Sequence, residues 1–220
     1  MKHFFTLFLV LNSFCVLNAQ GTNLNKLKIL KPGTVLTYQV YALHKEQGWS
    51  GIRIKEGESI GDSLVITLVN TSKGLQPMDY DDKGKPYYGT TINIEQYTKA
   101  STYANFIDAI INVESATTIF LSDKLFGKFN ITVYPEWEKD FFEFKKDHKV
   151  VPFSFKFNNE LIKSTINYYK TNKENDTMVT TLAFLNDKDF PIQTHMYLEF
   201  NGKDRYGLLF KLSEIKTINE

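Results

Sequence analysis

The stretch VPFSFKFNN, residues 151–159, decides the fold class. Its apolar residues fall on every second position: Val151, Phe153, Phe155 and Phe157. A period of two places these side chains on one face of a β-strand. Asn158 and Asn159 follow, and asparagine tolerates the positive φ that a tight hairpin turn requires. The stretch therefore predicts a half-buried strand that ends in a reversal.

The same alternation continues to the C-terminus. Four more strands are expected in 161–170, 178–184, 190–200 and 206–212. The segments between them are rich in Asn, Asp and Gly: 172–176, 186–189 and 201–204. Such short connections leave no room for crossover helices, so the sequence predicts an antiparallel meander and no parallel pairing in this region.

The N-terminal half carries similar signals at lower density. Pro32-Gly33 indicates a turn, and strands are expected at 35–43, 64–68, 87–94, 117–121, 130–134 and 140–144. One short helix is expected at 100–113, because its apolar residues recur at helical spacing: Tyr103, Phe106, Ile107, Ile110 and Val113.

About ten antiparallel strands and one helix predict a mainly β protein. A twisted sheet of that size curls or splits, so we expect a meander that closes into a barrel or half-barrel, with a two-sheet sandwich as the alternative. The length suits a single β domain over residues 20–220.

Residues 1–19 have the layout of a secretory signal peptide. A short basic start at Lys2 and His3 precedes an apolar run, and Ala19 provides a small residue before Gln20, where cleavage is expected. The alternative is trimming at Cys15 with lipid attached to its thiol. We therefore expect a periplasmic or secreted protein, with no membrane span once the signal is removed.

The composition argues against several kinds of site and partner. Cys15 is the only cysteine of the chain, so removal of the signal leaves no disulfide and no thiolate site. Basic and acidic residues number 26 and 25, which gives no electrostatic reason to expect nucleic acid as a partner. Neither a cofactor nor a metal is expected. Residues 79–84 begin like a calcium loop, but Lys83 occupies a ligand position and Thr90 replaces the final glutamate, so a hairpin turn is expected there.

Candidate catalytic residues are scattered. His44, His148 and His195 have no metal-binding spacing, and His195 shares the polar face of its strand with Gln193, Tyr197 and Glu199, so it is expected to face solvent. Two carboxylate pairs have the spacing to share a strand face: Glu136 with Glu138, and Asp187 with Asp189. Neither pair indicates catalysis by spacing alone.

Aromatic residues make up 15% of the chain. Those outside the alternating positions are Trp49, Tyr87, Tyr88, Trp137, Phe141, Phe142 and Phe144. They are expected either to pack in the core and at sheet edges or to surround an apolar cavity for a lipid-like or glycan ligand.

Three segments resemble the TapB-like family of exported bacterial β domains. They are the opening 30–38 (LKPGTVLTY), the turn 82–85 (DKGK), and the closing strand–turn–strand pattern of 184–215. The resemblance implies an envelope β-barrel without an assigned function, and it offers no functional residues.

These observations predict a non-enzymatic envelope protein, which acts as a binding or interaction module with an apolar small molecule or another envelope protein as its partner. The alternative is a periplasmic hydrolase with a dispersed active site of acidic residues and His195. A sheet that closes incompletely leaves an edge that another chain can extend, so self-association and peptide capture are both open.

Overall fold

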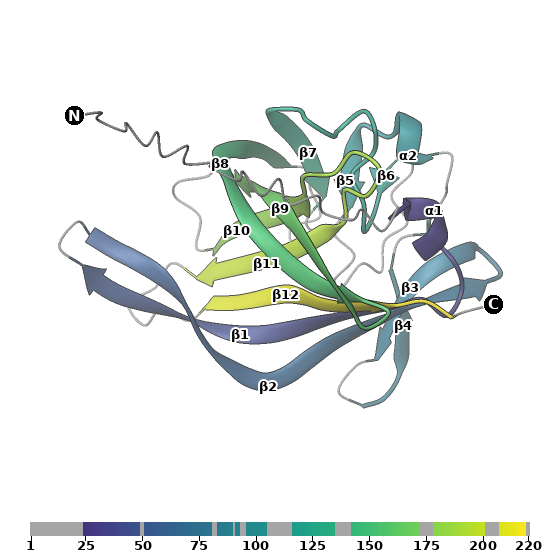
Figure 1. The fold of residues 1–220 in the computed structure, drawn as a ribbon, viewed down its shortest axis with the longest axis horizontal. Coiled ribbons are helices and arrows are strands. Elements are labelled where there is room, and N and C mark those ends of the chain that lie inside the picture. The colour runs from purple at the N-terminus through teal and green to yellow at the C-terminus, as the bar shows by residue number, and fades with distance from the viewer. Residues whose placement is uncertain are drawn as a thin grey trace, which may run out of the picture.

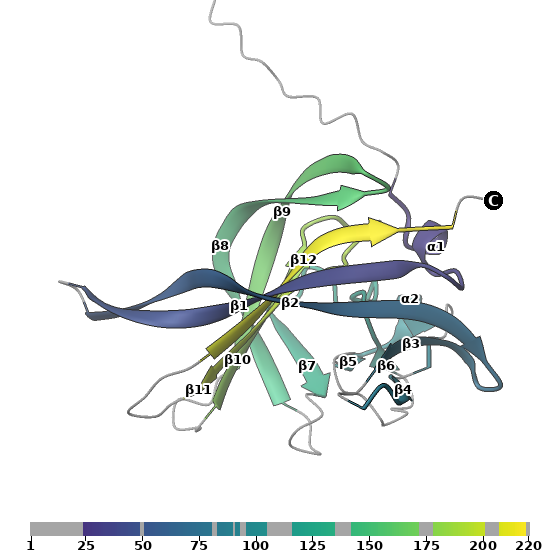
Figure 2. The same cartoon turned by 90° about the horizontal axis from the view of Figure 1, so that it is seen from below.

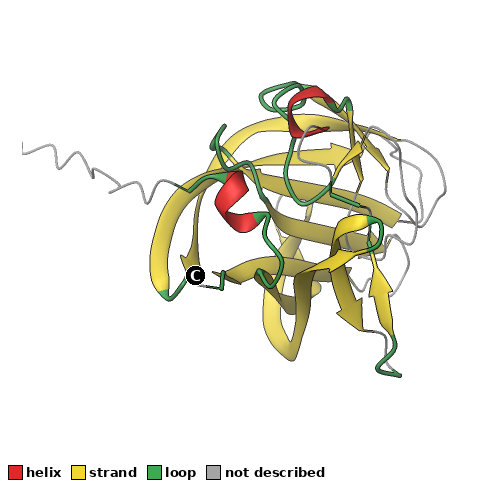
Figure 3. Ribbon diagram, turned by 90° about the vertical axis from the view of Figure 1, so that its right-hand side faces the viewer, coloured by secondary structure: helices red, strands yellow, loops and turns green. Residues whose placement is uncertain are grey.

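The computed structural model describes residues 24–48, 51–80, 83–89, 91–92, 96–104, 116–134, 142–171, 178–200 and 207–218 (Figure 1). Two one-turn helices, α1 (Lys26–Ile29) and α2 (Gln96–Lys99), lie at the same end of the molecule (Figures 1 and 3). The strands are β1 (Val35–Gly48), β2 (Gly51–Thr71), β3 (Gly74–Tyr80), β4 (Pro86–Tyr88), β5 (Thr102–Ala104), β6 (Ala116–Thr117), β7 (Asn130–Tyr134), β8 (Phe142–Phe157), β9 (Glu160–Thr171), β10 (Met178–Leu185), β11 (Gln193–Phe200) and β12 (Gly207–Lys216).

All these strands belong to one sheet, in the order β4-β3-β2-β1-β12-β11-β10-β9-β8-β7-β5-β6. The C-terminal meander from β8 to β12 is antiparallel at every consecutive pairing, as the alternating sequence predicts. Its first turn has φ values of 47° at Asn158 and 70° at Asn159, the left-handed conformation expected of this dipeptide.

The meander closes on itself as a ring of five strands. Beyond its pairing with β11, β12 turns to β8, where Glu214 and Ile215 lie opposite Lys156 and Phe157 (Figure 2). This contact is parallel, so the expectation of no parallel pairing in the region was wrong. An antiparallel meander with an odd number of strands must bring its first and last strands together in the same direction, and no crossover helix is needed.

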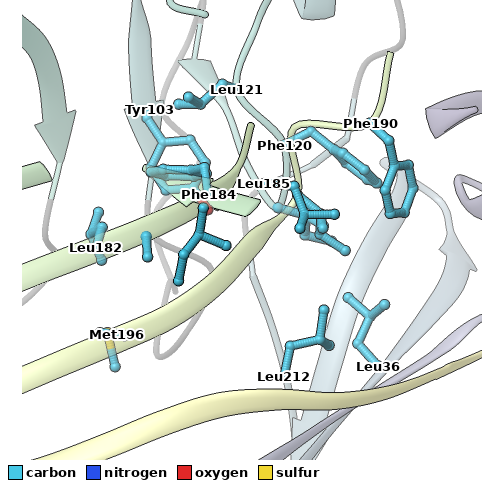
Figure 4. Packing of buried hydrophobic residues seen from close by; sticks show 14 of the residues in the cluster. Leu36, Tyr103, Phe120, Leu121, Leu182, Phe184, Leu185, Phe190, Met196 and Leu212 are labelled. Atoms are coloured by element: carbon cyan, nitrogen blue, oxygen red, sulfur yellow. The ribbon is translucent and has the colours of Figure 1, made fainter. Parts of the chain in front are cut away.

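The outer face of the ring forms the main core with a second layer. β5 and the loop after β6 pack against β10 and the start of β11, where Leu121 donates its N–H to the carbonyl of Pro191 and Phe120 bridges to Ile192 (Figure 4). Tyr103 meets Phe184 edge to face, with ring centroids 4.9 Å apart. Phe120 packs on Phe190 in the same manner at 5.3 Å. Hydrophobic burial between these layers is the principal source of stability.

Buried tyrosine hydroxyls donate hydrogen bonds within this core. Tyr38 donates to the carbonyl of Gln193 at 2.9 Å, Tyr103 donates to Oε1 of Gln193, and Tyr97 donates to the carbonyl of Thr118 at 3.0 Å. Burial raises the pKa of all three phenols, so they remain neutral donors.

Several sequence expectations need correction. Of the strand expected at 117–121, only Thr117 belongs to a strand, β6, and Phe120 forms an isolated bridge to Ile192. The helix at 100–113 is wrong where the structure describes it, because Thr102–Ala104 is strand β5 and Tyr103 faces the core between layers; residues 105–113 lie outside the described residues. The expected strand at 87–94 is shorter where the structure describes it: β4 ends at Tyr88, and Ile92 forms an isolated bridge to Leu75, while residues 90, 93 and 94 lie outside the described residues. Strand β3 was not expected, because Pro77 and a neighbouring glycine obscure its pattern.

The Pro32-Gly33 turn sets the entry to β1. Gly33 has φ +82° and donates its N–H to the carbonyl of Leu68 at 2.7 Å. We predict that Gly33→Ala lowers the free energy of unfolding by about 1–2 kcal/mol, because a side chain strains left-handed backbone and its Cβ displaces the exposed side chain of Ile218, a displacement that any side chain at this position shares. Gly33→Asn should cost clearly less, since asparagine visits this conformation. Urea unfolding measures both variants, and equal losses would contradict the strain argument.

Within the described residues, no helix has the length and apolar character required to cross a membrane.

Candidate functional site

Strand register separates the two faces of the ring. Phe153 on β8, Tyr168 on β9, Ala183 on β10, His195 on β11 and Lys211 on β12 share the inner face. Phe153 and His195 belong to strands that are not neighbours in the sheet, yet their ring centroids are 4.9 Å apart. That contact crosses the interior of the ring, so His195 points inward. The expectation that His195 faces solvent was wrong, because its side chain is only 3% exposed.

A β-bulge on β11 sets the orientation of the His195 side chain. The register of β10 with β11 shifts between Ala183 and Phe184, which leaves Thr194 as an extra residue on β11. The Thr194 hydroxyl donates to the carbonyl of Ala183 at 3.2 Å, and His195 Nδ1 lies 2.9 Å from the same hydroxyl oxygen. Since the hydroxyl hydrogen is already used, Nδ1 must carry the proton and donate. Nε2 is then the unprotonated nitrogen.

The electrostatics of His195 follow from its position. Burial, and then the positive charge of Lys211, lower its pKa to about 3. The imidazole is therefore neutral at physiological pH, and it is a weak proton acceptor. A general base is most effective with a pKa near the working pH. The adjacent Thr194 hydroxyl is fully buried and committed to a backbone carbonyl, so the pair fixes the bulge rather than forming a nucleophile and its base.

Polar and aromatic residues surround His195 at the end of the ring away from the closure. We call them the ring mouth: Tyr168, Lys170, His195, Tyr197, Glu199 and Lys211. The Tyr197 ring is stacked parallel to His195 at 5.9 Å, and Tyr168 lies 6.1 Å from it. The hydroxyl oxygens of the two tyrosines are 3.5 Å apart.

Three residues of the ring mouth carry charge: Lys170, Glu199 and Lys211. Lys211 Nζ is 5.6 Å from the ring centroid of Tyr41 on β1, a cation–π distance. Partial burial raises the pKa of Glu199, and Lys170 opposes that rise. Tyr168, Tyr197, Glu199 and Lys211 are all half-buried, so the inner face becomes accessible to solvent toward this end.

The opposite end of the ring is filled. Phe153 and Phe155 stack at 6.0 Å, Phe155 stacks on Phe190 at 6.4 Å, and all three are buried. Eight strands are needed before a barrel can hold a small ligand, so side chains alone occupy a ring of five. Most of the aromatic residues that the structure describes belong to the core, as the packing interpretation of the aromatic excess expects; of the extra aromatics, Phe144 is fully buried and Phe142 packs against the core.

The other sequence candidates do not join the ring mouth. Asp187 and Asp189 are exposed, and Asp187 accepts the backbone N–H of Asp189 at 2.9 Å, a turn-stabilising role. His148 is exposed and lies 5.5 Å from Phe129. Tyr88 is 41% exposed on β4. Ala19, Gln20, Cys15, Trp49, Glu136, Trp137, Glu138 and Phe141 lie outside the described residues, as do the side chains of His44 and Tyr87.

Cation ligands are equally dispersed. In the part of the chain that the structure describes, no three His, Cys, Asp or Glu side chains come together as a metal site would require. Lys83 and Gly84 lie in a turn, with φ +73° at the glycine, as expected for the loop that only begins like a calcium site.

Half of the ring mouth could be read from the sequence. His195, Tyr197 and Glu199 alternate along one strand, and that spacing places them on one face. Tyr168, Lys170 and Lys211 come from other strands, and only the pairing register brings them opposite. No local pattern in the sequence specifies that register.

A second feature is the outer edge of β2. β1 pairs with β2 along its whole length, but β3 pairs only with residues 67–71. Residues 51–66 therefore have no neighbour on the outer side among the described residues, and we call them the open edge. The pairing of this stretch with β1 shifts register between Ser63 and Glu56, and the N–H of Gly61 donates to the hydroxyl of Ser59 at 3.3 Å, so the edge is not a regular strand.

Comparison with known proteins found no match among protein family models, curated proteins or solved structures.

Proposed function

We propose that this chain is an exported, non-catalytic envelope protein that binds a saccharide at the ring mouth. One observation carries the proposal. Two half-buried tyrosine rings, a buried neutral imidazole and groups of both charges converge on one inward face at the accessible end of a closed ring. Binding sites typically combine apolar or aromatic surface with a few placed polar groups.

The filled end of the ring favours a sugar over a lipid. An acyl chain needs a deep apolar interior, and Phe153, Phe155 and Phe190 already occupy that space. A pyranose instead presents a flat C–H face and a rim of hydroxyls. The tyrosine rings can stack against the C–H face. The phenol hydroxyls, Glu199 and Lys211 can form hydrogen bonds with the sugar hydroxyls.

Catalysis is less well supported than binding at this site. The pKa of His195, near 3, makes it a poor general base, and the neighbouring Thr194 hydroxyl is inaccessible. The hydrolase alternative would need turnover of an ester, peptide or glycan that His195→Ala abolishes. Screening the purified protein and this variant on those three substrate classes is the direct test of the alternative.

Calorimetric titration tests the binding proposal. The panel contains neutral and acidic oligosaccharides, with fatty acids and sterols as apolar comparators. We expect saccharides to bind, and Tyr197→Ala and Tyr168→Ala each to weaken binding at least tenfold. Tyr88→Ala is the matched control, because Tyr88 is a partly exposed tyrosine on β4, outside the ring. Absence of binding by every saccharide, or an equal loss of affinity in all three variants, would refute the proposal.

A further inference from the structure

We infer that Asn158 is a positioning residue of the ring mouth, because it fastens the C-terminal segment to the β8–β9 turn and thereby keeps the ring of five strands closed. The inference rests on the proposed function, since the role that it assigns concerns the same site. It begins from the seam between β8 and β12, where two residue pairs meet: Lys156 with Glu214, and Phe157 with Ile215. The turn that follows β8 lies beside the end of β12 (Figures 1 and 2).

Asn158 makes three hydrogen bonds to the C-terminal segment at this seam, and we call them the clasp. Its backbone N–H donates to the carbonyl of Ile215 at 2.9 Å. Its side-chain Oδ1 accepts the N–H of Thr217 at 2.9 Å, and its Nδ2 donates to the hydroxyl of the same threonine at 2.8 Å. Asn158 and Thr217 are 59 positions apart in the chain, so the clasp is a tertiary contact and not a requirement of the turn.

The seam is the narrow end of a wedge between β8 and β12. Toward the ring mouth the two strands are no longer paired, and the side chains of Phe153 and His195 fill the space between them, with ring centroids 4.9 Å apart. His195 lies on β11 opposite Lys211 of β12. Separation of the strands at the seam therefore moves Phe153 away from His195 and changes the inner face that carries the ring mouth.

The seam is short without the clasp. The other pairings of the ring each extend over at least five residue pairs, whereas the seam has two. The three hydrogen bonds of the clasp are therefore a large share of the contacts that hold β8 to β12. A site that is held in place before its ligand arrives loses less freedom on binding, so closure of the ring strengthens binding at the ring mouth.

Glycine substitution separates the clasp from the turn. Asn158→Gly keeps a residue that tolerates positive φ but removes both side-chain hydrogen bonds. Asn159→Gly is the matched control, because this exposed asparagine has φ 70° in the same turn. We expect the nuclear Overhauser cross-peak between the rings of His195 and Phe153 to be lost in Asn158→Gly and kept in Asn159→Gly. A cross-peak of wild-type intensity in both variants, or its loss in both, would overturn the inference.

A second cross-peak shows that the variants are folded. The rings of Tyr103 and Phe184 lie 4.9 Å apart in the main core, and their cross-peak should persist in every variant. Thr217→Ala is the milder substitution, because it removes one bond of the clasp and leaves the backbone N–H of this residue in place. It should weaken the cross-peak between His195 and Phe153 less than Asn158→Gly does.

Titration of the same variants with the saccharide panel connects the clasp to the ring mouth. We expect Asn158→Gly to weaken saccharide binding at least tenfold and Asn159→Gly to leave it unchanged. Equal binding by the wild type and Asn158→Gly would overturn the inference while the proposed function stands. Loss of the cross-peak in Asn158→Gly, together with no saccharide binding by the wild type, would instead refute the proposed function and support closure of the ring by Asn158.

Discussion

Phe184→Ala is expected to lower the free energy of unfolding by about 3–5 kcal/mol, the usual range for removal of a fully buried phenylalanine. Phe184 is 1% exposed, at the junction between the ring and the layer that covers it (Figure 4). Its ring meets Tyr103 at 4.9 Å and Tyr169 at 5.9 Å, both edge to face. The substitution therefore leaves a cavity and removes two aromatic contacts from one core.

Equilibrium unfolding in urea measures this loss. Phe129→Ala is the control, because Phe129 is a phenylalanine with 44% of its surface exposed. We expect the control to cost about 1 kcal/mol or less, since surface substitutions rarely cost more. Similar losses for the two variants would contradict the placement of Phe184 between two packed layers.

The second large effect is a dependence of stability on pH that comes from His195. The pKa of this histidine is about 3 in the folded protein and 6.5 in the unfolded chain. Between these values the unfolded chain binds a proton that the folded protein does not bind. The contribution to stability is therefore complete above about pH 6.5 and declines as the pH falls toward 3. Each unit of pKa difference is worth about 1.4 kcal/mol, so the total is several kcal/mol.

Comparison with His195→Phe isolates this contribution. Carboxyl groups also titrate in the same pH range, but they do so in both proteins. We expect the difference in unfolding free energy between wild type and His195→Phe to shift in favour of the variant as the pH falls from 6.5 to 3. His148→Phe, at an exposed site, is the control for the substitution itself. A wild-type-minus-variant difference that stays constant with pH would show that His195 is not buried as a neutral group.

The alternating strands were the most predictable part of the protein. Period-two patterns such as Phe153, Phe155 and Phe157 depend on neighbours along the chain, and the five-strand meander follows from them. The Asn158-Asn159 turn was predictable for the same reason, because the backbone conformation that a tight hairpin needs is a local property of asparagine.

The features that failed depend on distant contacts. Tyr103 has the spacing of a helical residue, but tertiary packing against Phe184 and the hydrogen bond to Gln193 place it in a strand. Ring closure rests on two residue pairs between β8 and β12, and nothing in either sequence indicates them. His195 was assigned to solvent because Gln193, Tyr197 and Glu199 are polar. Closure places His195, Tyr197 and Glu199 inside the ring, and the bulge at Thr194 turns Gln193 to the other face, where it accepts from Tyr103.

In the candidate site too, local sequence determines some features and distant contacts determine the others. Alternation placed His195, Tyr197 and Glu199 together, and this much was predictable. Whether they form a surface or an enclosed group depends on the curvature of the sheet. Curvature comes from twist and bulges, such as the one at Thr194, and single-strand patterns do not encode it.

The inward orientation of His195 across the five-strand ring is the arrangement on which the proposed site depends, and nuclear Overhauser spectroscopy measures it directly. Ring protons of His195 and Phe153 should give a strong cross-peak, because their centroids are 4.9 Å apart although 42 positions of chain separate them. His195→Phe removes the imidazole resonance and confirms the assignment. An assigned imidazole that shows contacts to solvent and none to Phe153 would contradict the closed ring and the site at its mouth.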